Sequence, residues 1–321
     1  MTRTLGYSLC QLARTHGFNF KLWSLYDSQQ SLMSNYVIPE NFKGFSNSRL
    51  NFMLSTIRKA AHTDHLILSH INLAMLGVMV KLINPSCKVY LIAHGIEVWR
   101  PLSSCQQLLL KKCDLIFCVS SYTQQQVIQR HRIDANKTLV INNALDPFMP
   151  LPEQFCRPAY LTRRYQIEDH HHVLLTLTRL ASSEQYKGYE QVIKAVARLK
   201  ADYPFLKYIL AGQYDATEEK RIHQLVQQHD VQEQVLVTGF IPNHELSDHF
   251  SLADLFVLPS KKEGFGLVFI EALACGLPVI CGNADGSTDA IKKGELGHSI
   301  NADDVEAVSY THLTLPTILR V

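Results

Sequence analysis

The sequence predicts an α/β fold made of two successive doubly wound domains. Short continuous apolar runs alternate with helical patterns along most of the 321 residues, and a proline-rich stretch at residues 146–152 divides the alternation into two series. Continuous apolar runs are typical of strands buried on both faces. Strands that alternate with helices indicate a parallel sheet with right-handed crossovers. A chain of this length also suits about two domains.

The first series defines a domain over residues 1–150. The chain opens on a helical pattern that includes Leu5, Leu9 and Leu12 and ends at Gly17, and residues 19–25 then alternate like a strand. Later strands are expected at residues 65–69, 88–93, 115–119 and 138–142, with helices at 72–82, 105–112 and 122–130. Because a doubly wound domain normally begins with a strand, a start on a helix predicts that this domain lacks its first strand.

The second series defines a domain over residues 151–307. Pro147, Pro150 and Pro152 remove backbone donors and predict a linker before it. Strands are expected at residues 173–178, 207–211, 235–238, 255–258 and 278–281, with helices at 189–200, 217–229, 244–251 and 267–274. Residues 308–321 abandon the preceding helical pattern and resemble a translated sequencing adapter, so we expect a non-native tail, with a genuine short strand as the alternative.

The composition excludes a disordered chain and a chain built around a membrane-spanning helix. Apolar residues make up 46% of the sequence, and no apolar run approaches the ~20 residues that cross a bilayer. Eight cysteines without a Cys-x-x-Cys pair indicate a reducing, cytoplasmic location. The run from His170 to His172 suggests a metal site, but consecutive residues of a strand cannot all face one ion, so we expect a solvated turn.

The net charge of +2 hides an asymmetry between the two halves. Residues 1–150 hold 15 Lys and Arg against 7 Asp and Glu, whereas residues 151–321 hold 16 against 22. A basic first half and an acidic second half suggest domains with different partners, and an uneven scatter of solvated charges is the alternative. Basic pairs such as Arg58-Lys59 and Lys111-Lys112 fit an anionic lipid surface and equally fit ordinary solvated helix faces.

The loops after the strands of the second domain carry residues suited to a nucleotide. Arg179 follows the first of these strands and Lys187 precedes the next helix, so two cations flank a helix N-terminus, as a diphosphate requires. Ordinary surface cations are the alternative. Gly212 ends the second strand, where a glycine lets backbone approach a ligand. Phe240 and Ile241 follow the third strand, where they fit the edge of a base pocket.

The strongest signal lies at residues 259–280, where a buried strand is followed by a glycine loop, a helix and a tight turn into another strand. Gly264 and Gly266 free backbone N–H groups to point at phosphate, and the helix dipole reinforces them. Glu263 lies in the loop, and Glu271 lies on an otherwise apolar helix face. An ionised carboxylate there is costly unless hydroxyls or cations meet it, and a ribose diol would do so.

On these residues the chain resembles family 4 of the retaining glycosyltransferases. The match rests on a Glu-x7-Glu motif, here Glu263 to Glu271, and on the segment that follows it at residues 274–280. Further landmarks occur in the family's order at residues 94–99, 113–120, 140–146, 179–188, 211–212 and 253–260. The resemblance covers about residues 5–307. It implies two Rossmann-like domains that face each other across a cleft, the GT-B type.

The resemblance implies transfer of a hexose-type sugar from a nucleotide-diphosphate donor to a glycan or glycolipid acceptor, with retention, in cell-surface polysaccharide biosynthesis. Arg179 and Lys187 would neutralise the departing diphosphate, whose growing charge makes cations bind tighter in the transition state. Glu263 would hydrogen-bond the donor sugar, Glu271 would bind the ribose, and His94 of the first domain would reach the sugar or the acceptor. The residues whose amides would face phosphate and sugar are Gly264, Phe265, Gly266 and Leu267.

The family acts without a metal, and the sequence has no Asp-x-Asp motif, so we expect neither metal nor cofactor. From the resemblance we expect the chain to lack the family's first strand, its glycine-rich loop and its closing helices, and Asp289 stands where the family often has Glu. Two other functions stay open, an inactive donor-binding fragment and a sugar-nucleotide epimerase. We expect no nucleic-acid partner. Peripheral contact of the basic first domain with the inner face of the membrane is a further expectation.

Overall fold

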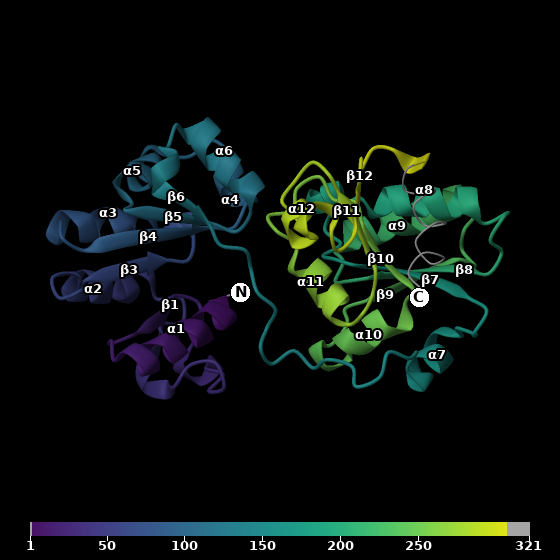
Figure 1. The fold of residues 1–321 in the computed structure, drawn as a ribbon, viewed down its shortest axis with the longest axis horizontal. Coiled ribbons are helices and arrows are strands. Elements are labelled where there is room, and N and C mark those ends of the chain that lie inside the picture. The colour runs from purple at the N-terminus through teal and green to yellow at the C-terminus, as the bar shows by residue number, and fades with distance from the viewer. Residues whose placement is uncertain (1, 307–321) are drawn as a thin grey trace. The chain divides into compact units, whose positions relative to one another are not determined.

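A computed structural model of the chain describes residues 2–306. The chain divides into two compact units, Met1–Phe148 and Met149–Val321 (Figure 1). The division falls inside the proline-rich stretch, close to the predicted boundary after residue 150. The predicted non-native tail, residues 308–321, lies outside the described residues.

The larger sheet of the first unit has four parallel strands in the order β3-β4-β5-β6. Its strands are β3 (His65–Leu68), β4 (Lys88–Ala93), β5 (Leu115–Cys118) and β6 (Thr138–Val140). Its helices are α3 (Ala74–Ile83), α4 (Ile96–Trp99), α5 (Ser104–Lys112) and α6 (Ser121–His131). The side chains of Val89, Leu91 and Ile116 are fully buried, as the continuous apolar runs predict.

A separate two-stranded parallel sheet lies nearer the N-terminus of this unit. It pairs β1 (Leu22–Ser24) with β2 (Phe42–Gly44). The predicted N-terminal helix is confirmed as α1 (Thr2–His16), and Gly17 follows it with φ +70°. A further helix, α2 (Arg49–Ala60), packs against α3. No element was expected at β2 or α2. A strand of three residues has no readable period, and α2 buries only Phe52 and Ala60, so its apolar face is narrow.

The sheet of the second unit has six parallel strands in the order β12-β11-β10-β7-β8-β9. The strands are β7 (His172–Leu177), β8 (Leu206–Ala211), β9 (Val235–Gly239), β10 (Leu255–Leu258), β11 (Val279–Gly282) and β12 (His298–Ile300). The chain thus builds outward from β7 to β9, returns to pair β10 with β7, and continues in the other direction. This is the strand order of doubly wound dinucleotide-binding sheets.

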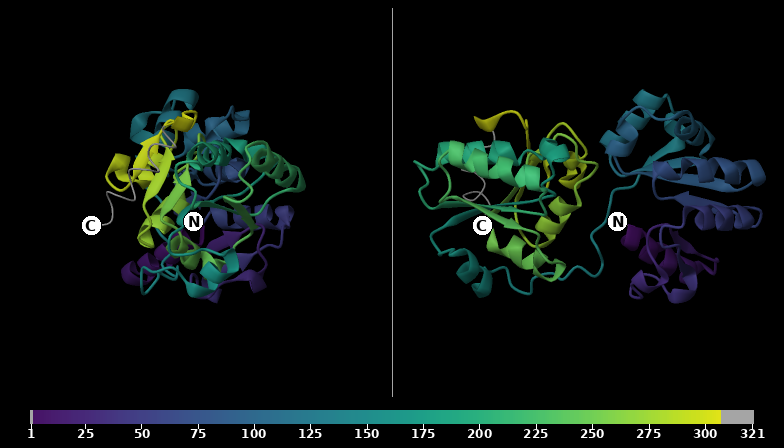
Figure 2. Two further views of the ribbon diagram at one scale, coloured as in Figure 1. Left: turned by 90° about the vertical axis from the view of Figure 1, so that its right-hand side faces the viewer. Right: turned by 180° about the vertical axis from the view of Figure 1, so that it is seen from behind.

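Helices cover both faces of this sheet (Figures 1 and 2). One face carries α8 (Tyr189–Leu199) and α9 (Ala216–Gln228), and the other carries α10 (Leu246–Leu252) and α11 (Leu267–Ala274). Two shorter helices are α7 (Ala159–Tyr165) and α12 (Ser287–Ala290). The predicted apolar face of α8 is confirmed, because Val192, Ile193 and Val196 are fully buried in the core beside β8 and β10.

The predicted fold class is therefore confirmed in each unit, an α/β arrangement with parallel sheets. The helix α11 begins and ends at the predicted residues. The helix α7 and the strand β12 lie in segments where no element was expected. Between residues 2 and 306, no helix is long and apolar enough to cross a membrane.

Candidate functional site

The strand order of the second unit reverses between β7 and β10, which pair directly with each other. In open α/β sheets, ligands bind in the crevice outside the carboxyl ends of the strands at such a reversal. The loops that follow β7 and β10 hold six of the predicted site residues, which are Arg179, Lys187, Glu263, Gly264, Phe265 and Gly266. These two loops form the candidate site.

An ion pair joins the two loops. The Lys187 ammonium lies 2.6 Å from a Glu263 carboxylate oxygen, and the two side chains are 13% and 19% exposed. Water screens a largely covered pair less than a solvated one, so the contact holds both side chains in place. The sequence predicts separate roles for these residues, a phosphate cation and a sugar ligand. The structure brings the two together.

The same loops also pack backbone against backbone. The Lys261 amide donates to the Tyr186 carbonyl oxygen at 3.0 Å. Gly188 has φ +84°, and a Cβ at that position would overlap the Pro259 carbonyl oxygen. Glycine alone meets both the left-handed backbone and the close approach. The loop that carries Lys187 is therefore fixed against the loop that carries Glu263.

Asp285 holds the backbone of Glu263 and is absent from the predicted site. Its Oδ2 accepts the Glu263 N–H at 2.6 Å, and its Oδ1 accepts the Ser287 N–H at 3.0 Å and also the Ser287 hydroxyl. Asp285 is 1% exposed. Burial raises the pKa of Asp285 to about 6, although the hydrogen bonds from Ser287 and Glu263 oppose that rise. An aspartate shortly after an apolar strand was the signal that could have found it.

Arg179 is the more exposed of the two predicted cations. Its side chain is 71% exposed, and its guanidinium lies 3.1 Å from Glu184. A solvated pair of this kind is weak. The second Glu184 oxygen, Oε2, is buried without a hydrogen-bond partner among the described residues. Arg179 is therefore the cation of the two that is open to solvent, whereas Lys187 is largely covered.

The start of α11 presents backbone amides beside this ion pair. Gly266 precedes the helix with φ +84°, and a Cβ there would overlap the Phe269 ring. The first-turn amides of a helix have no partner within the helix, and the dipole favours negative charge there. Phe265 is 4% exposed, so its ring is packed away from solvent. Glu271 is half-buried in the second turn of α11.

The loops after β8 and β9 give a mixed picture. Gly212 has φ +144°, and a Cβ there would overlap the Thr178 carbonyl oxygen. The backbone of Thr178 approaches this glycine closely, so Gly212 lets the loop after β8 pack against the loop after β7. Phe240 is 67% exposed, whereas Ile241 is 7% exposed. The Phe240 ring is available to a base, and Ile241 serves as packing beneath it.

His94 lies in the first unit, directly after β4. Its Nε2 donates to the Ser69 carbonyl oxygen at 2.6 Å, and Glu97 accepts its backbone N–H at 2.6 Å. The ring is therefore oriented by contacts at both ends of the residue. His70 lies two residues after β3 and accepts the Asn72 N–H at 3.0 Å, and burial lowers the pKa of its imidazole.

The site in the second unit combines two cations, Lys187 and Arg179, with the N-terminus of α11 and the Glu263 carboxylate. The first three attract a phosphate group, and the carboxylate accepts hydroxyl hydrogen bonds. The part of the chain that the structure describes contains no group of three or more His, Cys, Asp or Glu placed to hold a metal ion.

Two family models match the chain, one in each unit. "Glycosyltransferase Family 4" matches residues 7–147, and "Glycosyl transferases group 1" matches residues 162–311. A GDP-mannose-dependent alpha-(1-6)-phosphatidylinositol monomannoside mannosyltransferase from Mycolicibacterium smegmatis is 29% identical over 251 residues, or 74% of this chain and 63% of the relative. The O-antigen chain mannosyltransferase B from Escherichia coli is 25% identical over 62% of this chain and 51% of its own length.

The chain thus spans less than two thirds of the length of these relatives. Among solved structures, Anabaena HepE in complex with UDP and glucose has a TM-score of 0.77 and 20% identity, over 97% of this chain and 85% of HepE. A glycosyltransferase from Rickettsia africae has a TM-score of 0.77 and 18% identity, over 99% and 85% of the two chains. At these identities the likeness concerns the fold. The two family models, one in each unit, support a GT4-like glycosyltransferase, and the likeness to the solved structures shows the GT-B fold.

Proposed function

We propose that this chain transfers a hexose-type sugar from a nucleotide-diphosphate donor to a glycan or glycolipid acceptor. The observation that carries the proposal is the Lys187–Glu263 pair, 2.6 Å apart at the strand reversal of a dinucleotide-type sheet. The proposal assigns the Lys187 ammonium to the phosphate and the Glu263 carboxylate to the sugar hydroxyls, the two kinds of group that a nucleotide-sugar presents. The relatives named for transfer of mannose support the same reaction class.

The role of each residue follows from the charge that develops on the donor during transfer. As the bond between the anomeric carbon and the phosphate oxygen breaks, negative charge grows on the diphosphate. Lys187, Arg179 and the α11 amides stabilise that charge more in the transition state than in the ground state. Glu263 accepts hydrogen bonds from the sugar hydroxyls, and Glu271 accepts them from the ribose. His94 is the residue of the first unit that we assign to the sugar or the acceptor.

The finer features of the reaction follow from the family. We propose retention of configuration at the anomeric carbon, and a role in cell-surface polysaccharide or glycolipid synthesis on the cytoplasmic side of the membrane. Eight free cysteines, six of them buried, fit a reducing compartment. We propose that the two cations replace a metal on the diphosphate, so activity should withstand a chelator. GDP-mannose and UDP-glucose are the first donors to try, because relatives are named for or solved with them.

The experiment measures transfer and donor hydrolysis with both donors, an extract of glycolipid acceptors and EDTA. Lys187→Met should lower kcat/KM by about 100-fold or more, the effect of removing one group that stabilises developing charge. Glu263→Gln should cause a comparable loss. Matched controls are Lys220→Met and Glu233→Gln, two exposed residues of the same unit that lie away from the β7 and β10 loops. Equal losses in the controls would remove the site from the reaction.

Two outcomes would replace the proposal. Protection of the second unit by nucleoside diphosphate, without turnover on any acceptor, would make the chain a donor-binding protein. Formation of a new nucleotide-sugar without acceptor would make it an epimerase.

A further inference from the structure

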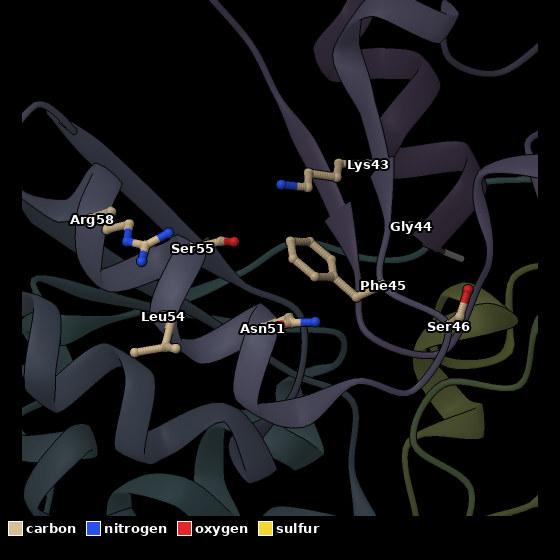
Figure 3. Close-up of a pocket in the computed structure, with 8 residues that line it drawn as sticks. All are labelled: Lys43, Gly44, Phe45, Ser46, Asn51, Leu54, Ser55 and Arg58. Atoms are coloured by element: carbon tan, nitrogen blue, oxygen red, sulfur yellow. The ribbon is translucent and has the colours of Figure 1, made fainter.

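The first unit contains a pocket of about 400 Å³ between β2, the turn after it and α2 (Figure 3). Its volume lies in the range of about 300–1,000 Å³ that small-molecule sites occupy. The residues that line it are Lys43, Gly44, Phe45, Ser46, Asn51, Leu54, Ser55 and Arg58. None of them is among the predicted site residues of the donor, and the pocket lies wholly within one unit.

Two cations face this pocket without a carboxylate partner. Lys43 extends from β2, and Arg58 extends from α2 toward the same space (Figure 3). Neither forms an ion pair among the described residues, and residues 41–63 contain no Asp or Glu. Asp27 lies next to the turn, but its carboxylate accepts the Ser24 hydroxyl at 2.6 Å and pairs with neither cation, so both charges remain available to a ligand. The lining thus selects an anion.

The Lys43 ammonium is held in place by aromatic rings. It lies 4.8 Å from the centre of the Phe45 ring and 5.4 Å from that of Trp23. Phe45 also packs edge-on against Phe52 of α2, with ring centres 5.1 Å apart. Cation–π contacts orient an ammonium while leaving its hydrogen-bond donors free. The pocket therefore exists before any ligand arrives.

Two residues of the turn between β2 and α2 have a strained backbone conformation. Ser46 and Asn47 have φ values of 47° and 65°, the left-handed region that side chains other than glycine rarely adopt. Their amides donate to the carbonyl oxygens of Asp27 and Leu25 at 3.0 and 2.7 Å, which holds the turn in this form. A Cβ at Gly44 would overlap the backbone of the turn at Ser28. Strain retained in this way is common at ligand sites.

The polar lining and the neighbouring apolar surface narrow the ligand class. Asn51 and Ser55 add uncharged hydrogen-bonding groups on the face of α2 that carries Arg58. Leu54 and Leu50, one turn apart on α2, are 39% and 62% exposed. Two cations suit a phosphate, the amide and hydroxyl suit hydroxyl groups, and the exposed leucines suit an apolar chain.

We propose that this pocket binds a phosphate ester that carries hydroxyl groups, either as a lipid headgroup or as a free sugar or polyol phosphate. Lys43 and Arg58 contact the phosphate oxygens from two sides, and Asn51 and Ser55 contact the hydroxyls. The pocket lies in the first unit, whereas Lys187 and Glu263 of the proposed donor site lie in the second, so the two sites can be tested separately.

The experiment uses the full chain and two kinds of probe. Inositol 1-phosphate and inorganic phosphate test the soluble source, and their binding is followed by the fluorescence of Trp23, whose ring lies beside Lys43. Vesicles of phosphatidylcholine, with and without phosphatidylinositol, test the lipid source by co-sedimentation. The pocket variants are Lys43→Met and Arg58→Gln. The matched controls are Arg49→Gln and Lys59→Gln, which remove the same charge from the same helix outside the lining.

Each pocket variant should weaken binding about tenfold, the effect of losing one charge-assisted hydrogen bond, and the controls should weaken it less than twofold. Loss in the soluble arm identifies a free phosphate ester as the ligand. Loss in the vesicle arm alone identifies the lipid headgroup. Equal losses in pocket and control variants would show a diffuse attraction of the basic helix and overturn the proposal. Absence of binding by the parent chain in both arms would also overturn it. The melting temperature of each variant, compared with that of the parent chain, shows that the variant is folded.

Discussion

Replacement of Asp285 by asparagine should change the free energy of unfolding differently at low and at neutral pH. Relative to the parent chain, the variant should gain stability as the pH rises. Burial raises the pKa of this carboxyl from 3.8 to about 6 in the folded chain. Between these two values the folded chain binds the proton and the unfolded chain does not. The free energy of unfolding therefore falls as the pH rises through this window. A shift of about two pKa units corresponds to about 3 kcal/mol.

Asparagine cannot titrate, so Asp285→Asn lacks this loss. The stability of the parent chain minus that of the variant should fall by up to about 3 kcal/mol between pH 3.5 and pH 7. Urea unfolding followed by far-ultraviolet circular dichroism measures the difference. Both tryptophans, Trp23 and Trp99, lie in the first unit, so their fluorescence is an internal reference that the substitution should leave unchanged.

A matched control has the opposite sign. Asp230 is exposed, and its hydrogen bond to Lys200 lowers the pKa of its carboxyl. Its contribution to stability is present at neutral pH and is lost as the pH falls, so Asp230→Asn should reverse the trend of the Asp285 variant. If the parent chain instead gains stability over Asp285→Asn as the pH rises, the three hydrogen bonds to Asp285 outweigh its burial, and the reasoning is wrong.

Three further substitutions test the packing around the site. Gly188→Ala should cost about 1–3 kcal/mol through backbone strain and should weaken nucleotide binding, whereas Gly294→Ala, also at positive φ but with open space around it, should weaken nucleotide binding not at all; thermal unfolding and nucleotide titration compare them. Glu218→Ala should cost about 1–3 kcal/mol in urea unfolding, because it leaves the buried Tyr189 hydroxyl without its acceptor, whereas Arg221 keeps Glu190 at 2.7 Å. Phe240→Ala should leave the melting temperature unchanged, since the ring is 67% exposed, and should weaken nucleotide binding about tenfold if a base stacks on it; unchanged affinity would exclude Phe240 from the base pocket.

The parts of the fold that follow from sequence are those with a long apolar signal. The helix α11 matches its prediction at both ends because Gly266 and the turn at Gly276 bound an apolar run. The strands β2 and β12 have three residues each, too few to show a period. The helix α7 follows the proline-rich stretch and has only one fully buried residue, Leu161, so its apolar face is too narrow to read.

The sequence predicts which residue types form the site, but it does not predict which of these residues contact each other. Lys187 and Glu263 are 76 residues apart, and only the pairing of β10 with β7 brings their loops together. Asp285 is 22 residues beyond Glu263. The family resemblance directs attention to Asp289 instead. Which residue meets another across a sheet depends on strand order, and strand order is decided by tertiary packing rather than by any local pattern.

Asp285 combines a cost in stability with support for the backbone of Glu263. At neutral pH its carboxylate is ionised although it is 1% exposed, a state that burial alone disfavours. The same carboxylate accepts the Glu263 N–H, and asparagine offers only one acceptor oxygen for the donors on both sides of it. The variant should therefore be more stable relative to the parent at pH 7 than at pH 3.5, and should still bind and transfer the donor less well. A stability gain without loss of transfer would show that Glu263 needs no such support, and that the loop is held by the Lys187 pair and the Gly188 contact alone.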